Sequence, residues 1–147
     1  MCVPLDSRRP ASETRPEIRE LLLAYTAGDP AVTVGLFRDG FLALDPSTVT
    51  MVDRERFASG LPERARMFAS IGATGTDLVC LDEHVLDEWH VLVDGTWRIR
   101  LSDADAPPLH LRSSFLLRRE DDRWQVAVYI NHQDVRAVIG ERSGTTD

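Results

Sequence analysis

The chain has 147 residues, of which 43% are hydrophobic and 28% are charged. That is the length of one domain and the composition of a globular rather than a disordered protein, and no apolar run is long enough to cross a bilayer, so we expect no membrane partner. The formal net charge of −7 argues against nucleic acid as a partner, because phosphate binding needs a basic field.

The two ends of the chain are predicted to be loose. Residues 1–14 hold two arginines but lack the apolar stretch of a secretory signal, so we expect a flexible N-terminal arm and, by default, a cytoplasmic location. The two cysteines, Cys2 in the arm and Cys80 in a strand-like run, are too few for a disulfide framework and are expected to be reduced. One domain is expected over residues 15–137, with a flexible tail over 138–147.

Two helices are predicted next along the chain. Thr14 and Glu17 have the spacing of a capping box, and apolar residues recur at helical intervals until Gly28: Ile18, Leu21, Leu22 and Tyr25. This pattern places Tyr25 on the inner face of the helix. Asp29 as N-cap and Pro30 at the first helical position then predict a second, short helix.

The segment FLALDP, residues 41–46, has strand composition and ends at Asp45-Pro46. From Asp53 to Gly72 the pattern is helical again, bent or restarted at Gly60 and Pro62. This helix carries an apolar stripe: Phe57, Leu61, Ala65 and Phe68.

After Gly75 the hydrophobic period becomes 2 and stays so to about residue 134. The C-terminal half is therefore predicted to be an antiparallel sheet, with every helix preceding it. Helices first and sequential strands afterwards predict an α+β fold, with the helices on one face of the sheet.

A tight turn at residues 120–123 would pair Glu120 with Arg123 and Phe115 with Val128, and a longer loop would pair Leu101 with Leu109. These registers gather apolar residues on one face, among them Trp89, Trp97, Phe115 and Ile130, with Ser113, His132 and Asp134 as polar members. The opposite face collects a basic cluster: Arg98, Arg100, His110, Arg112, Asn131 and Gln133. A solvated face, a dimer contact and an anion site all fit this cluster.

The order of two helices, the FLALDP strand, a third helix and long strands ending in DDRWQVAVYINHQDV resembles the nuclear transport factor 2-like superfamily, and within it the SnoaL-like proteins. The resemblance covers about residues 15–137. It implies a cystatin-like cone, in which a curved antiparallel sheet wraps around the N-terminal helices and leaves a pocket at its open end. It also implies a homodimer. It does not specify an activity, because the superfamily includes isomerases, polyketide cyclases, dehydratases and non-catalytic carriers.

Four residues are candidates for acid/base chemistry. The arrangement of ketosteroid isomerases resembles this chain at Asp45, as a base, and at Tyr25, as an oxyanion donor. His132 and Asp134 share a face about 7 Å apart along a strand, where the imidazole could move protons near neutral pH. Structural roles compete with each of these: Asp-Pro is a common turn, His132 could bond to the first helix, and Asp134 could cap the sheet.

A flat hydrophobic ligand would be held by Trp97, Ser113, Trp89, Phe115 and Ile130, and for the aromatic residues a plain core role is the alternative. No metal or cofactor is expected, because no third ligand converges on His132 and Asp134 and no glycine-rich phosphate loop is present.

Two functions stay open. The first is a pocket that binds a small, largely apolar molecule, with or without cofactor-independent isomerisation, cyclisation or dehydration. The second is a non-catalytic, dimeric binding or regulatory module that uses the basic face.

Overall fold

The computed structural model describes residues 15–143. The first half of the chain contains α1 (Pro16–Ala27), α2 (Pro30–Leu36), β1 (Phe37–Leu44), β2 (Val49–Val52) and α3 (Arg54–Ser70). Four long strands follow, β3 (Ala73–Val85), β4 (His90–Leu101), β5 (Leu109–Glu120) and β6 (Arg123–Asn131), and then α4 (Val135–Ser143). Within these residues, no helix has the length and apolar character needed to span a bilayer.

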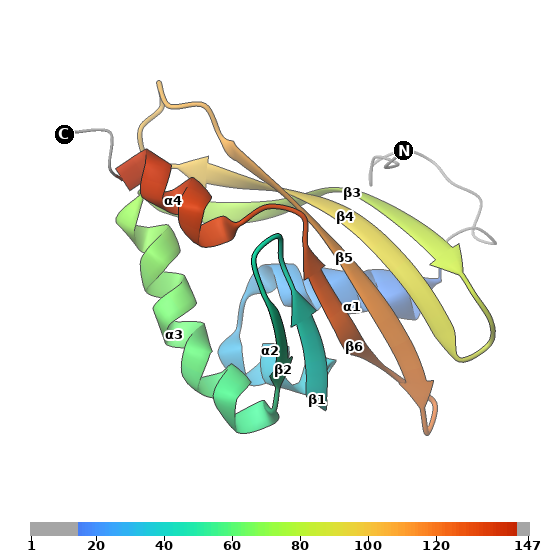
Figure 1. Ribbon diagram of the computed structural model, residues 1–147. Helices are drawn as coiled ribbons and strands as arrows, with labels where there is room; N and C mark the ends of the chain where they lie inside the picture. The colour runs from blue at the N-terminus through green and yellow to red at the C-terminus, as the bar shows by residue number, and fades with distance from the viewer. Residues whose placement is uncertain (1–14, 144–147) are drawn as a thin grey trace.

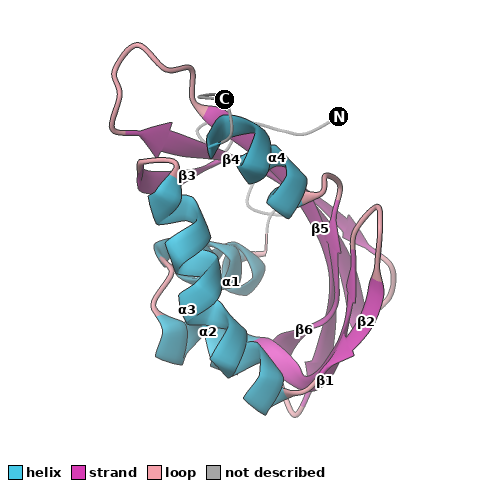
Figure 2. Cartoon of the chain, turned by 60° about the vertical axis from the view of Figure 1, so that its left-hand side comes forward, coloured by secondary structure: helices cyan, strands magenta, loops and turns pink. Residues whose placement is uncertain are grey.

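The six strands form one curved sheet in the order β2-β1-β6-β5-β4-β3 (Figure 1). Neighbouring strands are antiparallel except β1 and β6, which run parallel. Helices α1, α2 and α3 gather on the concave side of the sheet (Figure 2). The predicted α+β class and curved sheet are confirmed. The strands of the C-terminal half are antiparallel as predicted, and β1 adds a parallel pair with β6.

The main core lies between α1 and the concave face of the sheet. Ile18 and Leu22 of α1 are fully buried, as are Val91, Phe115 and Leu117 of β4 and β5. Phe37 of β1 joins the same cluster. The apolar period-2 positions of the long strands therefore do face the helices, as their alternation predicts.

The helix ends are partly as predicted. The Asp29 side chain accepts a hydrogen bond from the Ala31 amide at 3.0 Å and so caps α2. Gly28 ends α1 in the left-handed region, with φ of 78°. The predicted capping box is wrong, because the N-cap of α1 is Arg15 and no side chain caps it. Thr14 lies outside the described residues.

Two elements of the first half differ from the prediction. The first strand begins at Phe37, four residues before FLALDP, and the short strand β2 that pairs with it was not predicted. Helix α3 runs through both Gly60 and Pro62 without restarting. Proline removes one backbone donor from a helix, but here the flanking turns still hold the helix together.

Helix α4 corrects the expectation of a flexible tail for residues 138–143. The Ala137 amide donates to the Asp134 carboxylate at 3.2 Å, and Val135 and Ile139 are buried. Val138 packs on a small cluster formed by Ile99, Leu109 and Leu111. This helix was missed because charged residues and Gly140 dilute its apolar pattern.

A bulge in the β5–β6 pair changes which residues of β6 face the core. Leu117 pairs with Val126 as predicted, but Leu116 then pairs with Val128, so β6 holds one extra residue. Phe115 consequently pairs with Tyr129 and not with Val128. Because side chains alternate along a strand, every β6 residue from 128 onward lies on the face opposite to the predicted one.

The β4–β5 pair is offset by two residues from the prediction. Leu109 pairs with Ile99 and Leu111 with Trp97. An offset of two keeps each residue on its predicted face, so this error has no consequence for the site.

Cys80 on β3 is disulfide-bonded, so the expectation of a reduced thiol is wrong at this position. Cys2 lies outside the described residues. The cysteines therefore give no support to a cytoplasmic location, which stays a prediction.

Candidate functional site

A cavity of about 270 Å³ lies between the helices and the concave face of the sheet. Its apolar wall comes from α3 and from the strands: Leu61, Ala65, Phe68, Trp97, Ile99 and Leu111. This volume is near the lower end of the ordinary range for small-molecule sites, about 300–1,000 Å³, and such sites combine apolar walls with a few polar groups.

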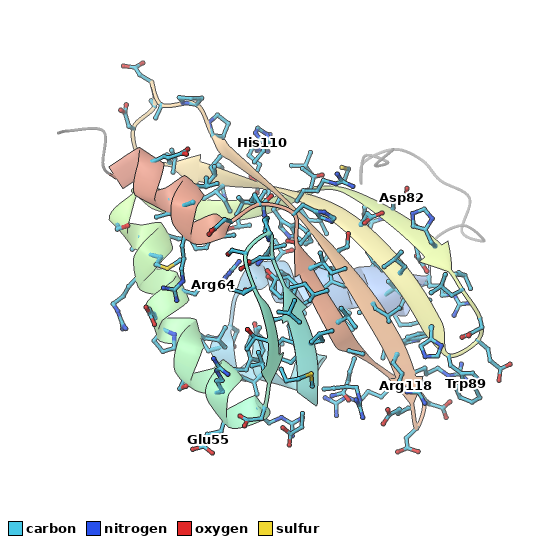
Figure 3. All side chains as sticks on the ribbon, viewed as in Figure 1. Glu55, Arg64, Asp82, Trp89, His110 and Arg118 are labelled. Carbon is cyan, nitrogen blue, oxygen red and sulfur yellow. The ribbon has the colours of Figure 1, made fainter. Side chains whose placement is uncertain are left out.

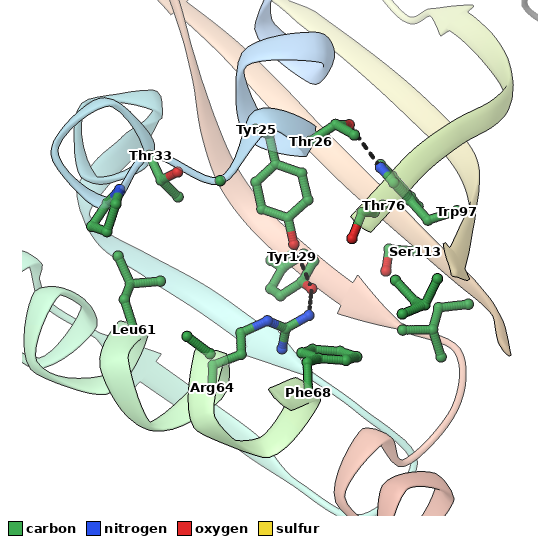
Figure 4. A pocket seen from close by; sticks show the side chains of 15 residues that line it. Tyr25, Thr26, Thr33, Leu61, Arg64, Phe68, Thr76, Trp97, Ser113 and Tyr129 are labelled. Atoms are coloured by element: carbon green, nitrogen blue, oxygen red, sulfur yellow. Dashed lines mark hydrogen bonds between the residues drawn. The ribbon is translucent and has the colours of Figure 1, made fainter. Parts of the chain in front are cut away.

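Three polar side chains from three elements meet in this cavity (Figure 4). The Tyr25 hydroxyl on α1 lies 3.0 Å from the Tyr129 hydroxyl on β6. The Arg64 guanidinium on α3 donates to the Tyr129 hydroxyl at 3.4 Å. We call Tyr25, Tyr129 and Arg64 the phenol–guanidinium cluster. The β6 bulge is what brings Tyr129 into it.

Aromatic packing fixes both phenol rings. The Tyr129 ring stacks on Phe115 with centroids 5.1 Å apart, and the Tyr25 ring meets Phe115 edge-on at 5.2 Å. Phe115 is fully buried. The hydroxyl positions are therefore set by the core, which holds the cluster in place without a ligand.

The cluster keeps its charge pattern over a wide pH range. Burial raises the pKa of Tyr25 well above its ordinary value, and the neighbouring Tyr129 raises it further, although Arg64 opposes this. Interaction with Tyr129 raises the pKa of Arg64 despite the loss of solvation. At neutral pH the cluster is thus a cation beside an un-ionised Tyr25 phenol.

Three threonines and a serine complete the polar lining: Thr26, Thr33, Thr76 and Ser113. Trp97 Nε1 donates to the Thr26 hydroxyl at 2.9 Å, and the Thr26 hydroxyl donates to the Leu22 carbonyl at 2.7 Å. Ser113 donates to the Asn131 side chain at 2.8 Å. Thr33 is 4% exposed, and its hydroxyl has no hydrogen-bond partner.

A family model described as "NTF2-like protein (DUF6841)" matches residues 14–134. The chain belongs to this NTF2-like family. The predicted resemblance to the nuclear transport factor 2-like superfamily is therefore confirmed. A search of curated proteins finds no match.

Solved structures similar to this NTF2-like chain share its fold at low identity. An NTF-2 like protein of unknown function from Shewanella oneidensis MR-1 is 13% identical, with a TM-score of 0.64 over 80% of this chain and 97% of that one. A ketosteroid isomerase-like protein from Erwinia carotovora atroseptica SCRI1043 is 12% identical, with a TM-score of 0.59 over 86% and 97%. A protein with a cystatin-like fold from Nostoc punctiforme PCC 73102 is 11% identical, with a TM-score of 0.66 over 80% and 89%. At these identities the likeness concerns the fold.

His132, predicted at the pocket mouth, lies on the outer face of the sheet and is exposed. Its Nε2 atom is 2.6 Å from the Ser114 hydroxyl, and that hydroxyl donates its proton to Asp94. The prediction was wrong because it assumed an unbroken β6 register. His132 and the cavity of this NTF2-like chain are on opposite sides of the sheet.

Asp45 closes the turn between β1 and β2. Its carboxylate accepts hydrogen bonds from the Ser47 amide and hydroxyl and from the Thr48 amide, at 2.8–3.0 Å. Slight burial alone would raise the pKa of Asp45, but the bonds from Ser47 and Thr48 together outweigh it and hold the pKa below its ordinary value. These contacts favour the turn role over that of a base poised near neutral pH.

Asp134 caps α4 and lines a second cavity of about 290 Å³ together with Asp45. Leu61, Arg64 and Tyr129 line both cavities, so the phenol–guanidinium cluster lies where the two adjoin. Asp134 and Asp45 thus share a cavity, but neither carboxylate lines the first one.

The predicted ligand-binding residues divide into three groups. Trp97 and Ser113 line the first cavity. Phe115 does not line the first cavity and is fully buried in the core. Ile130 faces outward because of the bulge, and Trp89 is 45% exposed at the far end of the sheet beside Arg118, remote from Arg64 (Figure 3). Placing Ile130 and Trp89 at the pocket was wrong.

Arg64, Tyr129 and Thr33 were not predicted as site residues. Arg64 carried a usable signal, since it lies three residues after Leu61 and four before Phe68 and so shares their helix face.

Within residues 15–143, no group of three or more His, Cys, Asp or Glu side chains has the arrangement of a metal site.

The raised pKa of Tyr25 gives a direct spectroscopic prediction. The chain contains two tyrosines, Tyr25 and Tyr129, and no lysine, so alkaline titration is simple to follow. The difference in tyrosinate absorbance between the wild type and Tyr25→Phe reports the ionisation of Tyr25. This difference should appear only well above pH 10, the ordinary pKa of a phenol. In urea the same difference should appear near pH 10.

The raised pKa of Tyr25 also predicts how the stability of the fold depends on pH. Because the folded-state pKa of Tyr25 exceeds the unfolded one, this phenol stabilises the fold fully below about pH 10, and the contribution is lost as pH rises above that value. Wild type should lose stability above pH 10 more steeply than Tyr25→Phe. Native tyrosinate appearing near pH 10 from Tyr25 would contradict the described phenol–guanidinium cluster.

Proposed function

We propose that this protein binds a small, largely apolar molecule in the cavity lined by Trp97 and the phenol–guanidinium cluster. The observation that carries the proposal is the cavity itself, because its wall is apolar and aromatic while its few polar groups come from separate elements and converge. Apolar walls supply affinity through the hydrophobic effect, and placed polar groups orient the ligand.

Binding is better supported than acid/base turnover. The residues that line the cavity include two phenols and a guanidinium but no carboxylate and no imidazole. Isomerisation, cyclisation or dehydration next to a carbonyl needs a base with a pKa near the working pH. Asp45 is engaged by its turn and His132 lies on the outer face, so neither supports that chemistry in this cavity.

The proposal is tested by titrating isotopically labelled protein with 2-naphthamide, a neutral and mostly apolar probe. The chain has three tryptophans, and Trp97 alone lines the cavity. We expect the Trp97 indole N–H signal to shift with probe concentration, while those of Trp89 and Trp124 stay in place. Trp97→Phe assigns the signal. A titration that leaves the Trp97 signal unmoved would contradict the proposal.

We also propose a homodimer formed through the outer face of the sheet. The strand registers place an apolar row across this face: Met51, Leu42, Val128, Leu116 and Leu92. Met51 is 61% exposed, and the other members of the row are only partly buried. Contiguous exposed apolar surface of this kind typically marks an interaction site.

The basic cluster is a weaker candidate for the contact. Arg98 and Arg100 both pair with Asp77, at 3.3 Å and 3.0 Å, which offsets their charge. Asn131, predicted in this cluster, points to the inner face, where it bonds to Ser113.

Sedimentation velocity separates the two surfaces. We expect wild type to sediment at twice the chain mass of 16.5 kDa, and Leu116→Lys/Val128→Lys to sediment as a monomer. Arg98→Glu/Arg112→Glu should remain a dimer, since it spares the apolar row. A wild type that stays monomeric throughout a dilution series would rule out the dimer, and dissociation only by the Arg98/Arg112 variant would move the contact to the basic cluster.

A further inference from the structure

Arg64 forms no ion pair with a carboxylate of residues 15–143, although it lines the second cavity together with Asp45, Glu63 and Asp134. Its guanidinium donates to the Tyr129 hydroxyl, and the groups that influence its pKa are the two phenols. A guanidinium has five N–H donors. The Arg64 side chain is half-buried, so its charge is partly desolvated, and a well-placed anion beside it would offset that cost.

The phenols add a further donor. Each phenol has one O–H proton, and only one of the two protons is used in the Tyr25–Tyr129 hydrogen bond, whichever residue donates it. Tyr129 also receives the Arg64 N–H bond, so its oxygen already acts as an acceptor. One phenol proton is therefore left without a partner among these groups. The cluster offers donors to the cavity: several N–H groups and one O–H group.

Thr33 gives an independent indication that a ligand belongs here. It lies on α2, and Figure 4 shows it apart from the phenol–guanidinium cluster. Its side-chain hydroxyl is buried and has no hydrogen-bond partner, although it lines the cavity. Buried polar atoms are normally satisfied, so a ligand polar group is a natural partner for this hydroxyl.

We infer that the ligand is a flat, largely apolar carboxylic acid, bound as the carboxylate against Arg64 and the free phenol O–H, with its apolar body along Trp97 and Phe68. A guanidinium matches a planar carboxylate with two parallel hydrogen bonds, and such charge-assisted bonds are stronger than neutral ones. The cation also lies over the Phe68 ring, 5.3 Å from its centroid, which helps to hold the guanidinium plane. This inference rests on the proposed function and adds the charge of the ligand.

Two probes that share one apolar body test the inference. Calorimetric titration with 2-naphthoate and with 2-naphthamide at neutral pH compares a carboxylate with its uncharged analogue. Wild type should bind 2-naphthoate at least about tenfold more tightly, which is the effect of one hydrogen bond to a charged group. Arg64→Met should weaken 2-naphthoate binding about 10-fold to 100-fold and change 2-naphthamide binding little.

Arg66→Met is the matched control, because Arg66 lies on the same helix and is exposed. It removes the same charge and should bind both probes as wild type does. Equal affinity of wild type for the two probes, or an unchanged preference in Arg64→Met, would overturn the inference while leaving the proposed function intact. Failure of both probes to bind wild type would overturn the inference and the proposed function together. The wild-type comparison needs no variant, so the result holds even if Arg64→Met does not fold.

Discussion

Phe115→Ala is expected to cost about 3–5 kcal/mol of the free energy of unfolding, the range for truncating a buried aromatic residue. Phe115 is fully buried, and its ring lies within 6 Å of three others: 5.2 Å from Tyr25, 5.7 Å from Trp97 and 5.1 Å from Tyr129. The alanine leaves a void against all three rings. Since a domain is stabilised by only about 5–15 kcal/mol, the loss would take a large part of the total.

Urea unfolding followed by circular dichroism measures this loss. Leu23→Ala is the control, because Leu23 on α1 is 43% exposed and its truncation should change stability by no more than about 0.5 kcal/mol. A loss below about 1 kcal/mol for Phe115→Ala would mean that the ring is not the packing centre of the site.

Gly95→Ala is expected to displace Trp97 and so to damage the cavity. A Cβ atom at Gly95 would lie 2.5 Å from the outer edge of the Trp97 indole. Trp97 is 4% exposed and packs against Tyr25 and Phe115, so the ring can move only toward the cavity that it lines. Overpacking of this kind costs about 1–3 kcal/mol. The displaced ring should also lose the 2.9 Å hydrogen bond from its Nε1 atom to the Thr26 hydroxyl.

The readouts for Gly95→Ala are the Trp97 indole N–H signal, the affinity for 2-naphthamide and the urea midpoint, all of which should change. Gly60→Ala is the control, because nothing lies within 4 Å of a Cβ atom there and the residue is inside α3. It should stabilise the fold by about 0.5–1 kcal/mol through helix propensity. A Gly95→Ala protein with unchanged Trp97 signal and probe affinity would contradict the described indole position.

Most of the fold could be predicted from sequence because strong local patterns agree with the tertiary arrangement. The helical period around Leu21 and Leu22 and the alternation in β4 and β5 each place apolar residues toward one core. The C-terminal end of the domain was harder to predict. Helix α4 has a weak apolar pattern, and its burial depends on Ile99 and Leu111, which are distant in sequence.

The β6 part of the site was predicted poorly for one physical reason. A single extra residue in β6 exchanges the two faces of that strand after Val126, and composition gives no sign of it. The exchange moved His132 and Ile130 to the outer face and brought Tyr129 inward. Arg64 could have been predicted without knowledge of the bulge, because its spacing from Leu61 and Phe68 already placed it on the inner face of α3.

A crystal structure of the protein grown with 2-naphthoate tests the central claim most directly. We expect the naphthalene ring in the cavity beside Trp97, with the carboxylate within hydrogen-bond distance of the Arg64 guanidinium and one phenol hydroxyl. A structure in which the cavity holds only water, while the probe lies elsewhere or is absent, would contradict the account.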